Sequence, residues 1–267
     1  MLDLEIIVYF LLLGSFVGVI AGLFGIGGGG VIVPILTTIF LSQGLDERSV
    51  VHMALGTSMA IIIVTSISSI RAQQKKKAII WDIVKMMAPG ILIGTFLVTF
   101  IASKLDSFYL SIIFSIFMLY SSIQMFIGKK PKPESKVFSK KTHFLSGGLI
   151  GGLSSLVSIG GGILSVPYLL MQNVDIKKAI ATSSAIGLPI AISGTIGYMV
   201  NGWGNTSMDT LTLGYVNLVA FVCVAVASFT TAPIGVMLVH KINVDVMKKL
   251  FSVLPFVLSI KMIYSLV

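Results

Sequence analysis

The chain has 267 residues, of which 55% are hydrophobic and only 11% charged, and its mean hydropathy is +1.01. Soluble domains carry about 25% charged residues, so this composition excludes an ordinary soluble protein and indicates a membrane protein. The net charge of +9 does not indicate a nucleic-acid partner, because the lysines cluster beside apolar segments, where they set membrane topology. The single cysteine, Cys223, excludes an intrachain disulfide and a cysteine metal cluster.

The first expected element is a retained membrane segment. The start, MLDLEIIVYF, carries Asp3 and Glu5 instead of a basic region, and no small-residue cleavage site follows, so a signal peptide is not predicted. Apolar segments that can cross a hydrocarbon core of roughly 30 Å recur along the chain. They are residues 6–24, 50–70, 83–101, 108–127, 144–159, 179–200, 211–239 and 250–267. These segments predict an all-α polytopic membrane protein.

Two glycine-rich motifs interrupt this apolar sequence. IGGGGVIVP covers residues 26–34 and IGGGILSVP covers residues 159–167. Consecutive glycines allow a sharp backbone turn, and Pro34 and Pro167 are expected in the first turns of the half-helices that follow, where a missing N–H costs least. Irregular backbone is tolerated inside a bilayer only where protein or a water-filled cavity surrounds it. Both glycine-rich turns, called the tips below, are therefore expected to face inward.

The motifs belong to an internal duplication. The triple glycine, the following proline and the flanking Gly14 and Gly147 align between the two halves, and ALGTS at 54–58 is echoed by AIATS at 179–183. Each repeat is predicted to be a glycine-tipped broken or re-entrant helical hairpin followed by three transmembrane helices. The expected organisation is a first membrane repeat at 1–127, a cytoplasmic lysine-rich linker at 128–142 and a second membrane repeat at 143–267.

The charge distribution predicts that the two repeats are inverted. If each hairpin enters and returns on one side, alternation places all 19 Lys and Arg residues inside except Arg48, Lys104 and Lys261, which is the positive-inside pattern. A parallel repeat would leave several lysines of the second half outside. Residues 163–171 are also short, about 14 Å as a helix, or roughly half of the core. Inverted repeats with broken helices are typical of secondary transporters.

The tips are the candidate substrate-binding site. N–H groups at the start of a half-helix carry the positive end of the helix dipole and favour an anion. The nearby Thr and Ser hydroxyls can donate to an oxyanion or, alternatively, cap their own helices or bond the preceding turn; small residues can also serve close helix packing. The candidate substrate-binding residues are Gly27, Gly28, Gly29, Thr57, Ser58, Ser158, Gly160, Gly161, Gly162, Thr182 and Ser183, with Pro34 and Pro167 in structural roles.

The tips are not identical. Ser158 stands where the first repeat has Gly25, and Ile163 stands where it has Gly30. A hydroxyl beside the second tip either adds a contact to an anion or fills space.

Carboxylates are expected only in termini, loops and helix ends, which disfavours a cation transporter. The sequence has no HExxH motif, no carboxylate pair and no GxSxG motif in a suitable context, so we expect no enzyme, catalytic residue, metal or cofactor. His52 and His240 lie at predicted membrane boundaries and are expected to be interfacial residues rather than proton relays.

The segments GVIAGLFGIGGGGVIVPIL and GGLIGGLSSLVSIGGGILSVPYLL, with the GTS and ATS motifs, resemble the TauE/SafE sulfite exporter family over nearly the whole chain. The resemblance implies a multi-pass permease of the cell (plasma) membrane that moves small sulfur-containing anions such as sulfite or organosulfonates, with the tips and hydroxyls lining the path.

The predicted function is a secondary transporter, an exporter of such anions, that works by alternating access around a mid-membrane site. The expected partners are the small anionic substrate and the lipid bilayer, with a proton or another ion as the candidate coupling ion and no nucleic acid. The alternatives are an anion channel and a non-transporting membrane scaffold or subunit.

Overall fold

The computed structural model describes residues 4–127, 138–204, 211–241 and 244–264, and every structural statement below concerns these residues. The first five helices are α1 (Leu4–Phe24), α2 (Gly29–Ser42), α3 (Glu47–Lys75), α4 (Trp81–Ala102) and α5 (Ser107–Ile127). The next five are α6 (Lys140–Leu156), α7 (Gly162–Met171), α8 (Ile176–Gly202), α9 (Leu218–Lys241) and α10 (Val244–Tyr264). A short antiparallel ribbon of β1 (Thr212–Leu213) and β2 (Val216–Asn217) precedes α9.

The prediction of an all-α polytopic membrane protein is confirmed. In the described part of the chain, six helical segments are long and apolar enough to cross a membrane: α1, α3, α4, α5, α8 and residues 218–239 of α9. The outward faces of these helices carry large apolar side chains, for example Leu97 at 59% and Ile116 at 64% exposed. Such faces are unfavourable in water and suit lipid contact, so the chain is a multi-pass membrane protein.

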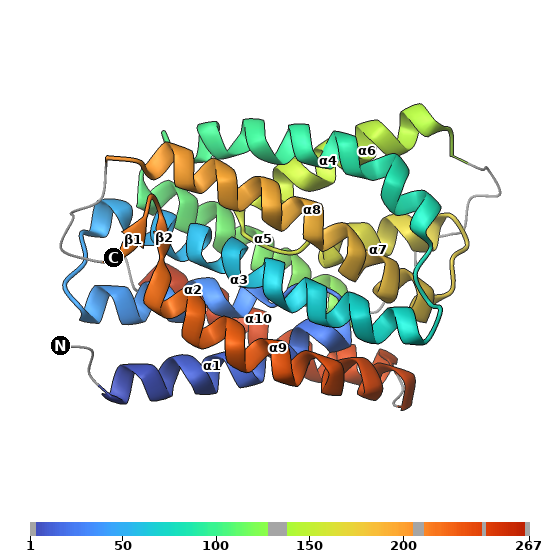
Figure 1. Ribbon diagram of the computed structural model, residues 1–267, viewed down its shortest axis with the longest axis horizontal. Helices are drawn as coiled ribbons and strands as arrows, with labels where there is room; N and C mark the ends of the chain where they lie inside the picture. The colour runs from blue at the N-terminus through green and yellow to red at the C-terminus, as the bar shows by residue number, and fades with distance from the viewer. Residues whose placement is uncertain (1–3, 128–137, 205–210, 242–243, 265–267) are drawn as a thin grey trace.

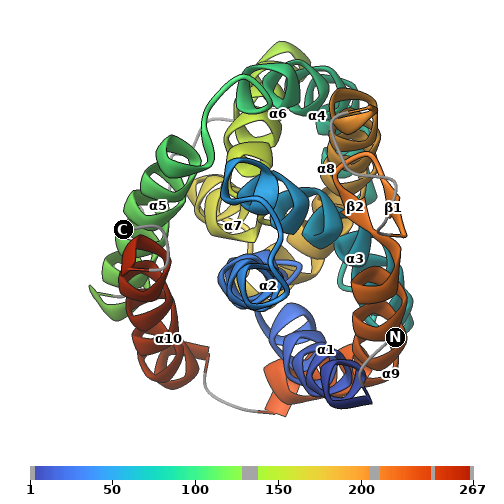
Figure 2. The same ribbon diagram turned by 90° about the vertical axis from the view of Figure 1, so that its left-hand side faces the viewer.

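The two short helices α2 and α7 lie inside the molecule and lead away from its centre in opposite directions. In Figure 1, α2 leads to the left-hand end, where α3 begins, and α7 leads to the right-hand end, where α8 begins. Figure 2 shows α2 almost end-on near the middle, with the long helices arranged around it. Two repeats inserted with opposite orientations would place α2 and α7 in this way, and the inverted repeat itself stays a prediction.

The two halves of the chain interlock. The first helix of each half packs on the fourth helix of the other half, so that α1 lies along α9 and α6 lies along α4. Glycines allow these close approaches: a Cβ on Gly14 would lie 2.5 Å from the carbonyl oxygen of Val224, and one on Gly147 would lie 2.5 Å from that of Met87. Because α3 also crosses α8 and α5 also packs on α10, neither half has a separate core.

The segment predicted as one span at 211–239 is not helical throughout. Its first residues form the ribbon, where Gly214 adopts a positive φ of 56° at the turn. Helix α9 begins only at Leu218, because the Asn217 side chain accepts a hydrogen bond from the Ala220 N–H at 2.9 Å and caps the helix.

The two prolines lie deeper in their helices than expected. Pro34 is the sixth residue of α2 and Pro167 the sixth residue of α7, so neither is in the first turn. The reason is that Gly28 and Gly161 adopt left-handed conformations and act as N-caps, which starts each helix directly after the tip. Each proline therefore leaves a carbonyl one turn earlier, at Gly30 or Ile163, without its helical N–H partner.

The predicted linker lies partly outside the described residues, which resume at position 138. Its last residues are helical, since α6 begins at Lys140, where the Ser139 side chain accepts a hydrogen bond from the Thr142 N–H.

Candidate anion site at the glycine tips

The two tips touch each other at the centre of the molecule. The Gly160 N–H donates to the carbonyl oxygen of Ile26 at 2.9 Å. A Cβ on Gly27 would lie 3.2 Å from the Gly160 Cα, and one on Gly162 would lie 2.6 Å from the Gly25 carbonyl oxygen. All of these glycines are buried. The structure therefore brings the predicted glycines of both repeats together, in a contact that leaves no room for side chains.

The backbone at each tip requires conformations that glycine favours. Gly28 and Gly161 have φ values of 83° and 79°, in the left-handed region. At the aligned positions Gly25 and Ser158, φ is 67° and 46°. Ser158 is therefore one of the few non-glycine residues held in this region, and its hydroxyl donates to the Leu55 carbonyl oxygen on α3 at 3.0 Å. This hydrogen bond anchors the second tip to the first half of the chain.

The tips present unpaired N–H groups. In an α-helix the first N–H groups have no partner within the helix, and here those of Gly29 and Gly30 in α2, and of Gly162 and Ile163 in α7, make no hydrogen bond to the described residues. Because the two helices lead away from the centre in opposite directions, their positive ends face each other across the tip contact.

Two aligned serines lie beside the tips. Ser183 on α8 donates to the Gly25 carbonyl oxygen at 2.9 Å. Ser58 on α3 is fully buried, yet its hydroxyl has no hydrogen-bond partner among the described residues. It lies on the helix face shared by Leu55, which accepts from Ser158, and Ile62, which contacts the first tip. A buried unpaired hydroxyl at this position is a free group for a ligand.

The two threonines of the predicted site have other partners. Thr57 accepts the N–H of Asn217 at 2.9 Å, and Thr182 accepts the N–H of Ile80 at 3.0 Å. Both N–H groups immediately precede a helix of the opposite half, α9 and α4. The alternative that these threonines cap their own helices is wrong, since they lie beyond the first turn of α3 and α8. By accepting these hydrogen bonds, the two threonine oxygens link each half of the chain to the other. A substrate-binding role would use the hydroxyl hydrogens, and this role stays a prediction.

The N-caps of α3 and α8 are aspartates. The side chains of Asp46 and Asp175 accept the N–H groups of Arg48 and Lys177 at 2.9 Å. In the described ranges, no three His, Cys, Asp or Glu side chains come together in a way that could hold a metal ion.

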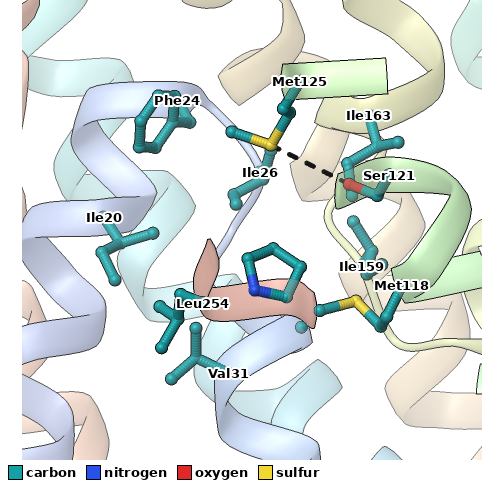
Figure 3. A pocket seen from close by; sticks show the side chains of 12 residues that line it. Ile20, Phe24, Ile26, Val31, Met118, Ser121, Met125, Ile159, Ile163 and Leu254 are labelled. Atoms are coloured by element: carbon teal, nitrogen blue, oxygen red, sulfur yellow. Dashed lines mark hydrogen bonds between the residues drawn. The ribbon is translucent and has the colours of Figure 1, made fainter. Parts of the chain in front are cut away.

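A narrow cavity reaches the tips from the side of α5 and α10 (Figure 3). Its volume of about 20 Å³ holds about one water molecule. Met118 on α5 lies against Gly30, and the Ser121 hydroxyl faces the sulfur of Met125 at 3.9 Å. The lining is otherwise apolar and includes Ile20, Phe24, Ile26, Val31, Ile159, Ile163, Leu254 and Pro255. In this arrangement the cavity is too small for a polyatomic anion to pass through it to the tip N–H groups.

Sequence reasoning missed two buried polar residues near the site. Tyr198 is fully buried, and its hydroxyl donates to the Ser155 carbonyl oxygen at 2.9 Å. Its partner lies on another helix, so no local pattern could have revealed it. His52 was expected at an interface but is only 3% exposed, because the end of α4 and the ribbon cover it. The side chain of His240 lies outside the described part of the structure.

Comparison with known proteins places this arrangement in a family. The family model described as "Sulfite exporter TauE/SafE" matches residues 10–262. A "Probable membrane transporter protein" of Haemophilus influenzae is 36% identical over 253 residues, which cover 94% of this chain and 96% of the relative. A "Probable membrane transporter protein" of Methanocaldococcus jannaschii is 32% identical over 238 residues, or 87% of this chain and 86% of the relative.

A third relative, "Probable membrane transporter protein YdhB" of Bacillus subtilis, is 27% identical over 274 residues and covers 98% of this chain and all of its own length. With a family match that runs from the second turn of α1 to the last turn of α10, the chain belongs to the sulfite exporter TauE/SafE family and is a multi-pass membrane transporter.

Proposed function

We propose that the chain is a secondary transporter that exports small sulfur-containing anions, such as sulfite or organosulfonates, by alternating access around the two tips. The observation that carries the proposal is the opposed pair of half-helix starts, whose first N–H groups have no partner in the described part of the chain, beside the buried hydroxyl of Ser58, which also has none there. These groups are donors, and donors at helix N-termini bind anions.

The chemistry of the surroundings supports an anion over a cation. The described carboxylates at the starts of α3 and α8 are Asp46, Glu47 and Asp175, and all three are exposed at the outer ends of these helices. An anion held by N–H and hydroxyl groups avoids the desolvation penalty of a buried ion pair. We therefore propose that the predicted tip glycines and Ser58, Ser158 and Ser183 bind the substrate, with Thr57 and Thr182 at the borders of the site.

The contact between the tips supports alternating access. The tips are linked by the Gly160–Ile26 backbone hydrogen bond, whereas Thr57 and Thr182 link the halves at two points farther out. In the proposed cycle the inverted repeats rock against each other, so that one of these outer links opens while the other stays closed. A permanently open channel is disfavoured, because the tips are in direct contact.

Purified protein in proteoliposomes tests the proposal. Vesicles loaded with radiolabelled sulfite, thiosulfate, sulfate or a short alkanesulfonate should release at least one sulfur anion faster than protein-free vesicles do, and cations should not compete. Failure of the whole panel, or tight binding of a cation, would contradict the proposed function.

The variant Ser58→Ala tests the site itself. Because its hydroxyl is unpaired, we expect no loss of thermal stability but a loss of about 1.5–3 kcal/mol in binding of the transported anion, or roughly tenfold to a hundredfold in affinity. The matched control is Ser228→Ala, since Ser228 is equally buried but donates to the Ala225 carbonyl oxygen of its own helix. Unchanged affinity in Ser58→Ala would remove this hydroxyl from the site.

A further inference from the structure

Helices α3 and α8 pack against each other in a regular antiparallel register. A Cβ on Gly194 would lie 3.0 Å from the Met59 sulfur, and one on Gly187 would lie 3.4 Å from the Ser66 hydroxyl oxygen. Seven residues forward along α3 therefore correspond to seven residues back along α8. Since residues three or four apart share a helix face, the next contacts along this crossing can be placed from the register.

The register places Ser69 of α3 opposite Ser184 of α8. Ser69 lies three residues after Ser66, and Ser184 lies three residues before Gly187, its contact on α8. Both serines belong to the buried part of the crossing, with 2% and 4% of their surface exposed. Two hydroxyl groups thus face each other across the α3–α8 crossing.

The internal duplication leads to the same pair. The offset that aligns ALGTS with AIATS places Met59 at the position of Ser184. The same offset places Ser69 at the position of Gly194. The contact between Met59 and Gly194 therefore has its equivalent in the other half of the crossing, between these two serines.

The Ser69 hydroxyl has no hydrogen-bond partner among the described residues. Two neighbours on α3 differ in this respect, since Thr65 donates to the Ile61 carbonyl oxygen at 3.2 Å and Ser68 donates to that of Phe229 on α9 at 2.6 Å. Burial of a hydroxyl without a hydrogen bond is unfavourable. Ser69 is therefore a donor that a ligand can use at no cost to an existing hydrogen bond.

Ser184 connects this pair to the first tip. Its hydroxyl donates to the Ile180 carbonyl oxygen of its own helix at 3.2 Å, and its oxygen would lie 3.1 Å from a Cβ on Gly25. From Ser69, α3 continues for about 9 Å to Lys75. The pair thus lies between the first tip and the lysine-rich end, which is formed by the α3–α4 and α7–α8 connections and carries lysines at 75–77 and 177–178.

The equivalent space on the ribbon side of the tips is apolar and filled. The Met59 sulfur and methyl group would lie 3.0 and 3.2 Å from a Cβ on Gly194, and both residues are buried. One turn farther toward the ribbon, the Tyr198 side chain packs on Gly56. The two halves of the crossing therefore differ in chemistry, with hydroxyl groups on the lysine-rich side and a thioether on the ribbon side.

We propose that Ser69 and Ser184 form a second subsite for the transported anion, one step from the tips toward the lysine-rich end. Ser69 donates to an oxygen of the anion directly, and Ser184 donates once its hydroxyl turns away from Ile180. The ligand is a small anion with several acceptor oxygens, and it enters when α3 and α8 separate at this end. That this ligand is the transported substrate rests on the proposed function, whereas the preference for an anion at Ser69 does not.

Cysteine modification tests the charge preference without any knowledge of the substrate. In a Cys223→Ser background, Ser69→Cys is treated with sulfonatoethyl methanethiosulfonate, which is itself a short alkanesulfonate anion, or with the cationic trimethylammonioethyl reagent. Each rate is divided by the rate of the same reagent at Gln74→Cys, an exposed position at the same end of α3, which cancels the reactivity of the reagent and the attraction by surface lysines. We expect the normalised rate at Ser69→Cys to be several-fold higher for the anion than for the cation.

The matched control is Ser68→Cys. Ser68 is 3% exposed and adjacent to Ser69, but its hydroxyl is directed to Phe229 on α9 and not to α8. This position should react slowly with both reagents. Equal rates at Ser69→Cys and Ser68→Cys, or a faster normalised reaction of Ser69→Cys with the cation, would overturn the proposal.

Alanine variants test binding at the subsite. Because Ser69 makes no hydrogen bond to the described residues, Ser69→Ala should keep the melting temperature of the parent while the anion concentration for half-maximal efflux from vesicles rises several-fold. Ser68→Ala should show the reverse, a lower melting temperature with an unchanged half-maximal concentration. Parent-like half-maximal concentrations in both Ser69→Ala and Ser184→Ala would overturn the subsite.

The two kinds of measurement separate this proposal from the proposed function. If no sulfur anion is transported but Ser69→Cys still prefers the anionic reagent, the proposed substrate is wrong and the anion-selective position stands. If a sulfur anion is transported and Ser69→Cys shows no preference for the anionic reagent, the subsite alone is wrong.

Discussion

At the scale of single residues, the tip glycines are needed for two separate reasons. Gly28 and Gly161 supply left-handed backbone conformations that start α2 and α7, so a side chain there is strained whatever space surrounds it. Gly29 has an ordinary helical backbone, but a Cβ on it would overlap the Ser158 carbonyl oxygen of the opposite tip. The first reason concerns the backbone conformation within one tip, and the second concerns the close contact between the two tips.

The variant Gly29→Ala separates these reasons. Because the new methyl group must push the tips apart, we expect a loss of about 1–3 kcal/mol in stability, with transport reduced more strongly than in the control. The control is Gly44→Ala, a loop position with φ of 76° and no heavy atom within 4 Å of a new Cβ, where only local backbone strain of about 1 kcal/mol is added.

Thermal unfolding in detergent and vesicle efflux measure both effects. Equal melting temperatures and transport rates for Gly29→Ala and the parent would show that the tip contact is loose enough to absorb a methyl group.

At the scale of elements, the long helices are joined through glycine faces. In the α4–α6 pair a Cβ on Gly90 would overlap the Phe144 carbonyl oxygen, and one on Gly94 would overlap that of Gly148. Within membranes such close packing replaces the hydrophobic effect as the force that joins helices. Since α4 and α6 come from different halves of the chain, this contact and the α1–α9 contact hold the halves together.

The pair Gly94 and Gly148 provides a matched test of this packing. The variant Gly94→Ala places a methyl group on the Gly148 backbone and should destabilise the protein by about 1–3 kcal/mol. The variant Gly148→Ala should be nearly neutral, because its Cβ would lie 3.5 Å from the nearest atom, the Gly90 carbonyl oxygen, which is an ordinary contact. Thermal unfolding of both variants gives the comparison, and a melting temperature for Gly148→Ala as low as that of Gly94→Ala would contradict the geometry.

At the scale of the whole molecule, charge is distributed unequally between the two ends. The end formed by the α3–α4 connection, the start of α6 and the α7–α8 connection carries the lysine clusters at 75–77, 140–141 and 177–178. The opposite end carries Arg48 and Lys104. Positive charge favours the cytoplasmic side, so we infer that the ribbon and the α2–α3 connection are outside.

Labelling of intact cells tests this orientation. In the Cys223→Ser background, Gly44→Cys should react with a membrane-impermeant maleimide, while Lys76→Cys should react only after the membrane is permeabilised. Both positions are exposed in connections between helices. A difference in their labelling therefore reports the side of the membrane and not burial within the protein. Labelling of Lys76→Cys in intact cells would invert the topology and place the ribbon on the cytoplasmic side.

The sequence by itself determined that the protein lies in a membrane, that it is helical, that the glycine tip occurs twice and that α7 is too short to cross the membrane. These features follow from the lengths of the apolar segments and from glycine and proline, which act locally along the chain. It did not determine which residues contact one another in the folded protein. That Thr57 accepts a hydrogen bond from Asn217, and that His52 is buried, depends on segments 160 and 50 residues away in the chain. Only the tertiary structure decided these points, since the interlocked halves supply each residue's partners from the opposite repeat or a distant helix.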